Sequence, residues 1–487
     1  MSDHEIELKF ACGADDLAAV LAAAPPGDDE SRELISVYFD TPDLALQKAG
    51  ASLRVRESKG RRVQTLKRGE GLFREEHEAP IDGLAPDPEL GPLPSLMPQG
   101  ASLRPAFNVR VSRRQRTFRY LDAEIELALD QGEVTGGEQK SPICEVELEL
   151  KSGPPSALFA LARELSAAAP LYIAFETKAA RGQALVAGQA RSARHNNGVE
   201  LSSGASVAEA FQSVARRALA QIAANAAVLR ADPGPDAVHQ LRVGARRLRS
   251  ALTAFKPALA GEGLDVRTAD LRWLSHACDR ARNLDVFAEE TLRPAAGGPV
   301  TPEGLPALRK AVEAERRRAW ASAADAASSA RFRALMIDTT AWVETGDWRN
   351  GEVAGGSIGP FADRALTRRV RSFRKRARDA RDGDDTARHR LRIEAKKLRY
   401  TAEALASLYG RKHAGRYLHG VRELQEVLGA LNDLATVEPL IASLTLRPEA
   451  AFAAGELVGL QIAGKPRLVA RAAKAAERLA GTKPFWG

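Results

Sequence analysis

Acidic and basic side chains alternate with apolar ones in several short segments near the start of the chain. The stretch EIELK at residues 5–9 places Glu5, Glu7 and Lys9 on one side of an extended chain, because strand side chains point alternately to opposite faces. Carboxylates stacked two residues apart repel one another unless a cation binds between them. A hard divalent ion with oxygen ligands would relieve that repulsion, so this face has the residue types of a metal site.

The same alternation recurs in further segments, some of them acidic and some basic. EIELALD at 124–130 and CEVELELK at 144–151 carry acids, whereas SLRVRE at 52–57 and FNVRVSRRQR at 107–116 carry arginines. Carboxylates that hold a divalent metal, beside Arg and Lys that hold an anion bridging it, are what phosphoryl transfer requires. The alternative is an ordinary sheet face whose charges lie in water. Repetition over six strands favours the metal and anion site.

Eight extended segments would have to carry these faces. Residues 1–150 predict strands at 4–11, 33–40, 51–58, 61–68, 72–80, 106–119, 121–131 and 143–151, with helices at 14–24 and 155–168. Several of the strands are separated by turn sequences such as ESKG and RGEG. Eight such strands predict a closed antiparallel β-barrel.

Length and charge distribution indicate two domains. A chain of 487 residues is long for one domain. Residues 1–195 hold 24 Lys and Arg against 30 Asp and Glu, whereas the remainder holds 47 against 33. We predict a barrel domain at 1–187, a linker at 188–205 and an all-α domain at 206–487, whose pattern is helical throughout. The basic second half suggests a polyanionic partner.

Several classes of protein are not expected from this sequence. No apolar run approaches the roughly 20 residues of a membrane span, and the first residues lack the pattern of a secretory signal. The three cysteines are far apart and show no metal-ligand spacing, which favours reduced thiols in a cytoplasmic protein. A P-loop is not supported either, because GLQIAGKP at 459–466 has Pro466 where a metal-binding hydroxyl is needed.

The helical half contains an internal repeat. HQLRVGARRLR at 239–249 matches HRLRIEAKKLR at 389–399 at a constant offset of 150 residues, which predicts a duplicated helical unit. On each helix the basic residues form a stripe beside the apolar seam, whereas a solvated face would lie opposite it. We therefore predict polyanion contacts at His239, Arg242, Arg246, Arg249, His389, Arg392, Lys396 and Arg399.

The first 185 residues resemble a CYTH domain, also called a triphosphate tunnel metalloenzyme. The resemblance rests on EIELK, YFDTPDLALQKAGASLRVRE at 38–57, QTLK at 64–67, REEHE at 74–78, ELELKSG at 147–153 and FETKAARG at 175–182. It implies a barrel open as a tunnel, with a charged interior and apolar side chains packed outward against helices. It also implies hydrolysis of a triphosphate, inorganic tripolyphosphate above all, with Mg²⁺ or Mn²⁺.

The resemblance also implies roles for individual residues. The implied metal ligands are Glu5, Glu7, Glu76, Glu126, Glu147 and Glu149. The implied triphosphate contacts are Lys9, Arg54, Arg56, Lys67, Arg114, Lys178 and Arg181. Arg110 and Arg116 compete with Arg114 for one of these roles, and Glu145 is a further acid on a strand whose register stays open. No general base is identified.

The second half, from 206 onward, resembles a CHAD domain. The resemblance implies two pseudo-symmetric four-helix bundles, a basic surface around a central pore and binding of inorganic polyphosphate. The chain departs from the family pattern at Asp279, where the family has Gly, and at Asn283, where it has Asp; LGALND at 428–433 follows the pattern more closely.

Together these features predict a cytoplasmic triphosphatase that binds polyphosphate and is associated with polyphosphate granules. Three alternatives stay open. One is a thiamine triphosphatase or adenylate cyclase of the same superfamily, and another is a polyphosphate-binding scaffold with a silent barrel. The third, a nucleic-acid binder, is disfavoured because aromatic residues that could stack on bases make up only 5% of the chain.

Overall fold

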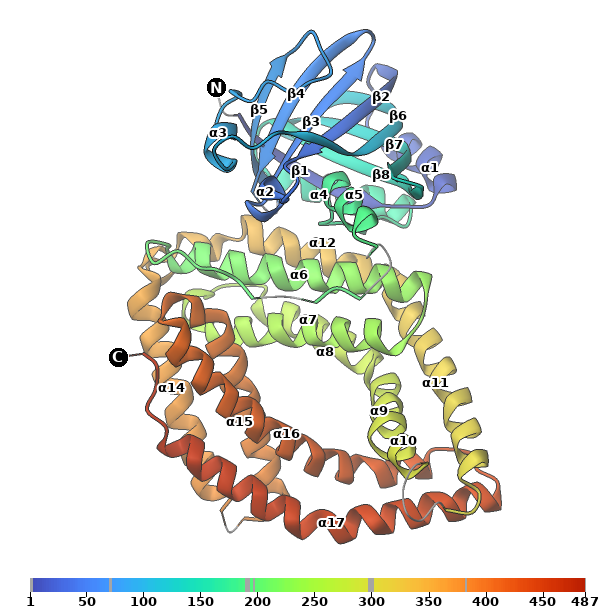
Figure 1. Cartoon of the computed structure of the whole chain (residues 1–487), viewed down its shortest axis with the longest axis vertical. Helices are drawn as coiled ribbons and strands as arrows, with labels where there is room; N and C mark the ends of the chain where they lie inside the picture. Colours follow the sequence, from blue (N-terminus) through green and yellow to red (C-terminus); the bar gives the residue numbers. More distant parts are fainter. Residues whose placement is uncertain are drawn as a thin grey trace. The chain divides into compact units, whose positions relative to one another are not determined.

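The structure is a computed structural model that describes residues 3–69, 72–188, 193–195, 198–296, 302–381 and 383–486. The chain divides into two compact units (Figure 1). The barrel unit comprises Met1–Ser192 with Ser329–Thr345, and the helical unit comprises Ala193–Ser328 with Gly346–Gly487.

The barrel is an antiparallel sheet of eight strands closed on itself. Its strands are β1 (Asp3–Ala11), β2 (Asp29–Asp40), β3 (Ala51–Ser58), β4 (Arg61–Arg68), β5 (Phe73–Pro80), β6 (Arg104–Tyr120), β7 (Ala123–Gly136) and β8 (Gln139–Ser152). They are hydrogen-bonded in the order β5-β4-β3-β2-β6-β7-β8-β1, and pairing of β1 with β5 completes the ring. The short β9 (Tyr172–Ile173) adds to β1. The predicted eight-stranded barrel is confirmed.

Alternation along the strands separates a charged inner side from an apolar outer side. On β3, Leu53 and Val55 pack outward with residues of α2 (Ala45–Lys48) and α3 (Leu93–Leu96). The alternating residues Arg54 and Arg56 face the interior. The outer apolar layer therefore holds the sheet together, which leaves the inner side for charge.

One end of the barrel interior is apolar and is covered by α5 (Lys178–Val186). Phe107, Val109 and Val111 on β6 form a buried cluster with Leu185 of α5. A Cβ at Gly182 would lie 2.2 Å from the Phe107 ring, so a residue without a side chain allows this close approach. Helix α5 therefore provides a floor for the charged part of the interior.

Three further helices belong to the barrel unit: α1 (Leu17–Ala23), α4 (Ser156–Ala168) and α12 (Ala330–Thr345). Helix α4 packs against β8 and α1, and α12 packs on α4 and β9. Arg163 of α4 forms an ion pair with Asp338 of α12, and Arg333 lies over the ring of Tyr172 at 5.7 Å. Residues from within the predicted helical domain thus complete the barrel unit.

The helical unit contains two four-helix bundles with equivalent connections. The first is built from α6 (Val207–Ala231), α7 (Pro235–Ala254), α8 (Leu264–Ala277) continued by α9 (Asp279–Phe287), and α11 (Leu305–Ser328); α10 (Arg293–Ala295) is a short connection. The second comprises α14 (Ile358–Asp379), α15 (Asp385–Leu405), α16 (Arg411–Ala442) and α17 (Pro448–Gly481), preceded by α13 (Glu352–Gly355). The predicted pair of four-helix bundles is confirmed.

The equivalence of the two halves extends to the start of the bundles, although the offset there is 151 residues. Ser206 and Ser357, the N-cap residues of α6 and α14, pair with each other in an antiparallel bridge. Equivalent positions meet there, as a pseudo-two-fold axis requires. Helices α7 and α15 pack side by side, and their seams, which include Leu241 and Leu391, are buried as predicted.

From Ala193 onward, the described part of the predicted linker belongs to the helical unit. The side chain of Asn225 exchanges hydrogen bonds of 3.0 Å with the backbone of Arg194. Leu201 is buried, and its N–H donates to Ser407 at 3.0 Å. Positions 189–192 and 196–197 of the linker lie outside the described residues.

Candidate functional site

A cavity of about 250 Å³ inside the barrel is lined mainly by charged side chains. Nine Lys or Arg and seven Glu form most of its wall, so cations outnumber carboxylates by two. The cations are Lys9, Arg32, Arg54, Arg56, Lys67, Arg74, Arg113, Lys151 and Lys178, and the acids are Glu5, Glu7, Glu76, Glu78, Glu126, Glu147 and Glu149. Such a wall suits a ligand that brings negative charge of its own.

Lys178 is the centre of a buried ion-pair cluster at the floor of the cavity. It is the first residue of α5, behind the N-cap Thr177. Its Nζ lies 2.6 Å from Glu147, 2.8 Å from Asp130 and 2.9 Å from Glu145. Burial alone would lower the pKa of Lys178, but these carboxylates raise it. Lys178 is therefore charged at neutral pH.

Glu147 binds two further cations that line the cavity. Lys9 Nζ lies 2.8 Å from its Oε1, and Arg113 donates to its Oε2 at 2.5 Å. Burial would raise the pKa of Glu147, but Lys178, Lys9 and Arg113 lower it well below the usual range. This carboxylate thus fixes the positions of three cations from β1, β6 and α5.

A second set of ion pairs joins β1 to β4 and β5. Lys67 Nζ lies 2.7 Å from Glu5 and 3.2 Å from Glu76. Burial would raise the pKa of Glu5, but Lys67 and Arg74 lower it. On the neighbouring side, Lys151 is paired with Glu149 at 2.7 Å. Most carboxylates of the wall therefore already have a cationic partner.

Glu7 differs from the other acids in its protonation equilibrium. It faces Glu149 in the register of β1 and β8 and contacts Arg74. Burial and the nearby Glu147 raise its pKa, although Lys9 and Arg74 act in the opposite direction. A divalent cation near Glu7 would favour its charged form.

Arg56 is a cation without an acidic partner among the described residues. Burial and the adjacent Arg54 and Arg113 lower its pKa to about 9, and its Nε donates to Ser36 at 3.4 Å. Like charges are thus held close together on this part of the wall. An anion bound between them would relieve their repulsion.

Tyr38 places a phenol among these cations. Its ring stacks on Phe107 with centroids 4.7 Å apart, and the residue lies opposite Arg54 in the register of β2 and β3. Burial would raise the pKa of Tyr38, but Arg54, Arg56 and Lys178 lower it. Its hydroxyl therefore lies where a phosphate oxygen could accept a hydrogen bond.

The structure brings eleven of the thirteen residues predicted for the barrel site to this cavity. They are Glu5, Glu7, Glu76, Glu126, Glu147, Glu149, Lys9, Arg54, Arg56, Lys67 and Lys178. Arg181 does not line the cavity. It pairs at 2.7 Å with Glu145, which does not line the cavity either. Glu145 is buried on the inner face of β8, which settles its register.

The predicted position of Arg114 needs correction. Its side chain is half exposed and pairs with Asp29 at 2.5 Å. Arg116 pairs with the same carboxylate at 2.7 Å, and Arg110 is exposed. The inner face of β6 carries Arg113 instead. The inward-facing residues in the first half of β6, Phe107, Val109 and Val111, are apolar. The more polar face of this half is therefore the outer one.

Four further residues of the wall had sequence signals of different strength. Arg74 and Lys151 share a strand face with the predicted Glu76 and Glu149, so alternation identifies them. Arg32 and Tyr38, by contrast, are set into the wall by the pairing of β2 with β3 and β6, and β2 itself shows no repeated charged face.

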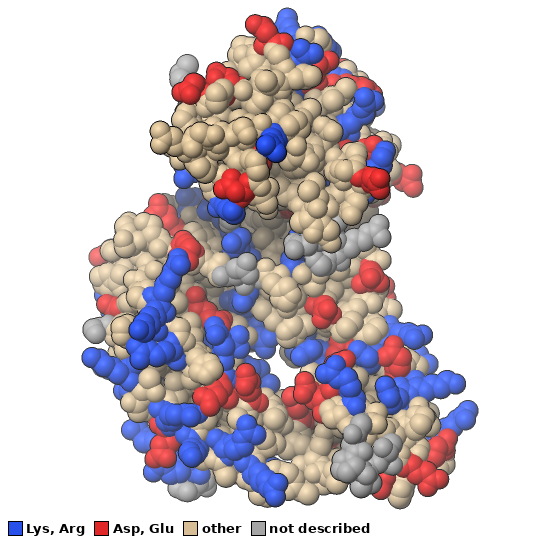
Figure 2. All heavy atoms as spheres, in the orientation of Figure 1, with Lys and Arg blue, Asp and Glu red and all other residues tan. Residues whose placement is uncertain are grey.

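The helical unit gathers five of the eight predicted basic residues between α7 and α15. They are His239, Arg242, Arg246, Arg392 and Lys396, and we call them the basic cluster. These side chains are close enough for each to act on the protonation of its neighbours. Figure 2 shows how densely Lys and Arg cover the visible face of the helical unit.

Burial and mutual repulsion disfavour the charged forms of side chains in the basic cluster. Burial, Arg392 and Arg246 lower the pKa of Lys396 to about 7. Burial and the nearby Arg282 of α9 lower that of His239 to about 4. The Nε atoms of Arg246 and Arg392 are buried with no hydrogen-bond partner among the described residues. These features suit a site that receives an anion.

The other three predicted residues behave differently. Arg399 donates to Glu403 at 2.8 Å, so its charge is already paired, and His389 is exposed. Arg249 is half buried beside Arg272, which together with burial lowers its pKa. The predicted stripes therefore meet in one compact cluster between the two helices. The remaining predicted residues, Arg249, His389 and Arg399, lie in environments that differ between the two repeats.

The two repeats also differ in where their acid lies. The first has Asp279 and Asn283, whereas the second has Gly429 and Asp433 at positions 150 residues later. Asp279 forms an ion pair with Arg242, which also donates to Ser275 O at 2.7 Å. The acid of the first repeat thus lies one helical turn before the position of Asp433 in the second repeat, and it pairs directly with Arg242.

Comparisons with known proteins match both units. A family model described as a CYTH domain matches residues 3–183, and one described as a CHAD domain matches residues 213–442. A curated protein named inorganic triphosphatase, from Haemophilus influenzae, is 31% identical over 193 residues, 37% of this chain and 55% of that protein. The match therefore spans about half of that relative's length.

A solved structure also resembles the chain. The crystal structure of the CHAD domain from the plant Ricinus communis covers 61% of this chain and 99% of its own, with 27% identity and a TM-score of 0.54. Separately, none of the helices within the described ranges is long and apolar enough to cross a membrane.

Proposed function

Because the chain is a CYTH domain followed by a CHAD domain, we propose that the barrel hydrolyses inorganic tripolyphosphate with a divalent metal ion and that the helical unit binds inorganic polyphosphate. The observation that carries the hydrolysis is the cavity wall, in which nine cations face seven carboxylates. The relative named inorganic triphosphatase supports the same activity.

The cations of the wall would hold the phosphates. Arg56, which has no acidic partner in the described part of the barrel, and Arg54 beside it would take one phosphate group. Lys9 and Lys178 would take another at the floor, by exchanging Glu147 for a phosphate oxygen. This placement lays the phosphate chain along the cavity and fixes its reacting bond.

The carboxylates would hold Mg²⁺ or Mn²⁺, which prefer hard oxygen ligands. No group of three His, Cys or acidic side chains lies close enough together within the described ranges to hold a metal, because Lys and Arg draw the carboxylates away. A polyanionic substrate would compete for those cations and so release oxygens of Glu5, Glu7 and Glu76. When bound, the metal would neutralise charge that develops on the transferred phosphate.

A substrate panel tests this proposal against the related activities. Phosphate release by the full chain should be greatest with tripolyphosphate, smaller with ATP and thiamine triphosphate, and absent with chelator. Faster release from thiamine triphosphate would instead favour a thiamine triphosphatase. Absence of release from every triphosphate with either metal would favour a binding scaffold with a silent barrel.

The basic cluster should make polyphosphate binding depend on pH. The pKa of Lys396 is about 7 in the unbound protein, and a bound polyanion would raise it, so binding takes up a proton. Affinity should then fall about tenfold between pH 7 and pH 8.5, as the unbound lysine loses its charge. Calorimetry at both pH values measures this fall. The control Lys396→Arg keeps its charge and should flatten the profile; an unchanged slope would contradict the assignment.

A further inference from the structure

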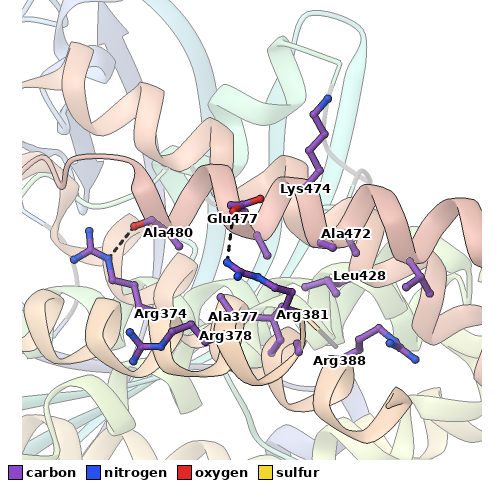
Figure 3. A pocket seen from close by; sticks show the side chains of 15 residues that line it. Arg374, Ala377, Arg378, Arg381, Arg388, Leu428, Ala472, Lys474, Glu477 and Ala480 are labelled. Atoms are coloured by element: carbon purple, nitrogen blue, oxygen red, sulfur yellow. Dashed lines mark hydrogen bonds and ion pairs between the residues drawn. The ribbon is translucent and has the colours of Figure 1, made fainter. Parts of the chain in front are cut away.

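A groove between α14 and α17 has a lining unlike that of the two sites above. It has a volume of about 260 Å³ and contains no residue of the basic cluster. Nine of its fifteen lining residues are aliphatic: Ala377, Ala380, Leu391, Leu428, Val469, Ala472, Ala473, Ala476 and Ala480. The side chains on facing helices are small, so the floor is open and apolar (Figure 3).

Cations surround this floor. Arg374 donates through Nε to the carbonyl of Ala480 at 2.9 Å, which anchors its guanidinium at the end of α17. Arg381 lies 3.5 Å from Glu477 in a weak, exposed pair. The side chain of Arg378 has no hydrogen bond or ion pair within the part of the chain that the structure describes. Lys474 and Arg388 complete the lining.

Arg374 and Arg378 have no arginine counterpart in the first bundle, whereas Arg381 corresponds to Arg230. Counting from the paired N-caps Ser206 and Ser357, the positions of α6 equivalent to Arg374 and Arg378 are Ala223 and Ala227. The same helix packing is thus made in the first bundle with alanines. The second bundle carries long basic side chains there, beside an apolar floor.

We propose that this groove binds an organic phosphate. The carbon-rich part of the ligand lies on the alanine floor, and its phosphate is held by Arg374, Arg378 and Arg381. A bare phosphate chain fits less well, because it would lose water to an aliphatic surface that returns no hydrogen bond. An apolar pocket with a few polar groups on one side is the usual form of a small-molecule site. Glu477 offers an acceptor for an amino group of the ligand.

Photolabelling locates such a ligand within the full chain. The probe is 8-azido-ADP, used in chelator so that metal-dependent binding in the barrel is suppressed. Labelled peptides should come from 374–391 or 469–480, and excess ADP should remove the label. The double variant Arg378→Ala/Arg381→Ala should lower this labelling about tenfold, because both phosphate contacts are charge-assisted.

The matched control is Arg364→Ala/Arg371→Ala, which removes two exposed arginines of α14 outside the groove. It should leave the labelling unchanged. Equal losses in both doubles, or label only in other peptides, would overturn the proposal. Pyrophosphate that competes as well as ADP would also overturn it, because the site would then recognise phosphate alone.

Discussion

Replacing Glu7 by glutamine should lower tripolyphosphate hydrolysis by about a hundredfold or more, because the amide removes a ligand charge from the proposed metal site. Higher concentrations of Mg²⁺ or Mn²⁺ should restore only part of the rate. Burial and Glu147 already raise the pKa of Glu7, so the fold favours a neutral side chain at this position. The thermal unfolding temperature should therefore stay close to that of the unmodified protein.

The control is Glu124→Gln, which removes an exposed acid of β7 that does not line the cavity. Its initial rates and its dependence on metal concentration should be unchanged. A Glu7→Gln protein that hydrolyses tripolyphosphate at the original rate, with the original metal dependence, would show that this carboxylate takes no part in metal binding.

Removing two charges from the basic cluster should weaken polyphosphate binding by about a hundredfold at fixed ionic strength. The variant is Arg246→Met/Lys396→Met, in which the unbranched methionines keep most of the buried stems. It takes one cation from each bundle, and Arg246 is among the charges that act on Lys396. Calorimetry with long-chain polyphosphate measures the change.

The matched double is Arg390→Met/Lys397→Met, which removes the same net charge from the outer side of α15. Arg390 is exposed, and Lys397 is paired with Glu394 at 2.7 Å. This control should lose about threefold or less, as expected for exposed charges. Equal losses would reduce the site to a diffuse basic surface, and tighter binding of duplex DNA would count against polyphosphate as the ligand.

The strands of the barrel could be predicted because their alternation is strict, but alternation does not say which face is inside. On β1 and β8 the charged face is the inner one, and the predicted residues lie in the cavity. On β6 the inner face changes from Val111 to Arg113, so the choice of Arg114 failed. Only the packing of α5 into one end of the barrel explains the difference, and no local pattern in β6 contains that packing.

The helical repeat was visible as a constant offset, but the unequal environments of its two copies were not. Arg399 pairs with Glu403, one turn further along its own helix, while Arg249 in the first copy lies beside Arg272. Arg242 is neutralised by Asp279, whereas its counterpart Arg392 keeps a buried Nε without a hydrogen bond among the described residues. Such differences depend on side chains from other helices, which the repeat does not preserve.

The ion pairs within the barrel have a consequence for how the two proposed sites respond to salt. In the cavity, Glu5 and Glu147 act as built-in counterions for Lys67, Lys9 and Lys178, so a phosphate chain that enters exchanges one set of anions for another. Few dissolved ions are released in that exchange. The basic cluster has far fewer internal anions, so its positive charge is balanced by dissolved anions. Polyphosphate would release them on binding, as polyelectrolytes do. Rising ionic strength should therefore detach polyphosphate from the helical unit well before it affects occupancy of the barrel.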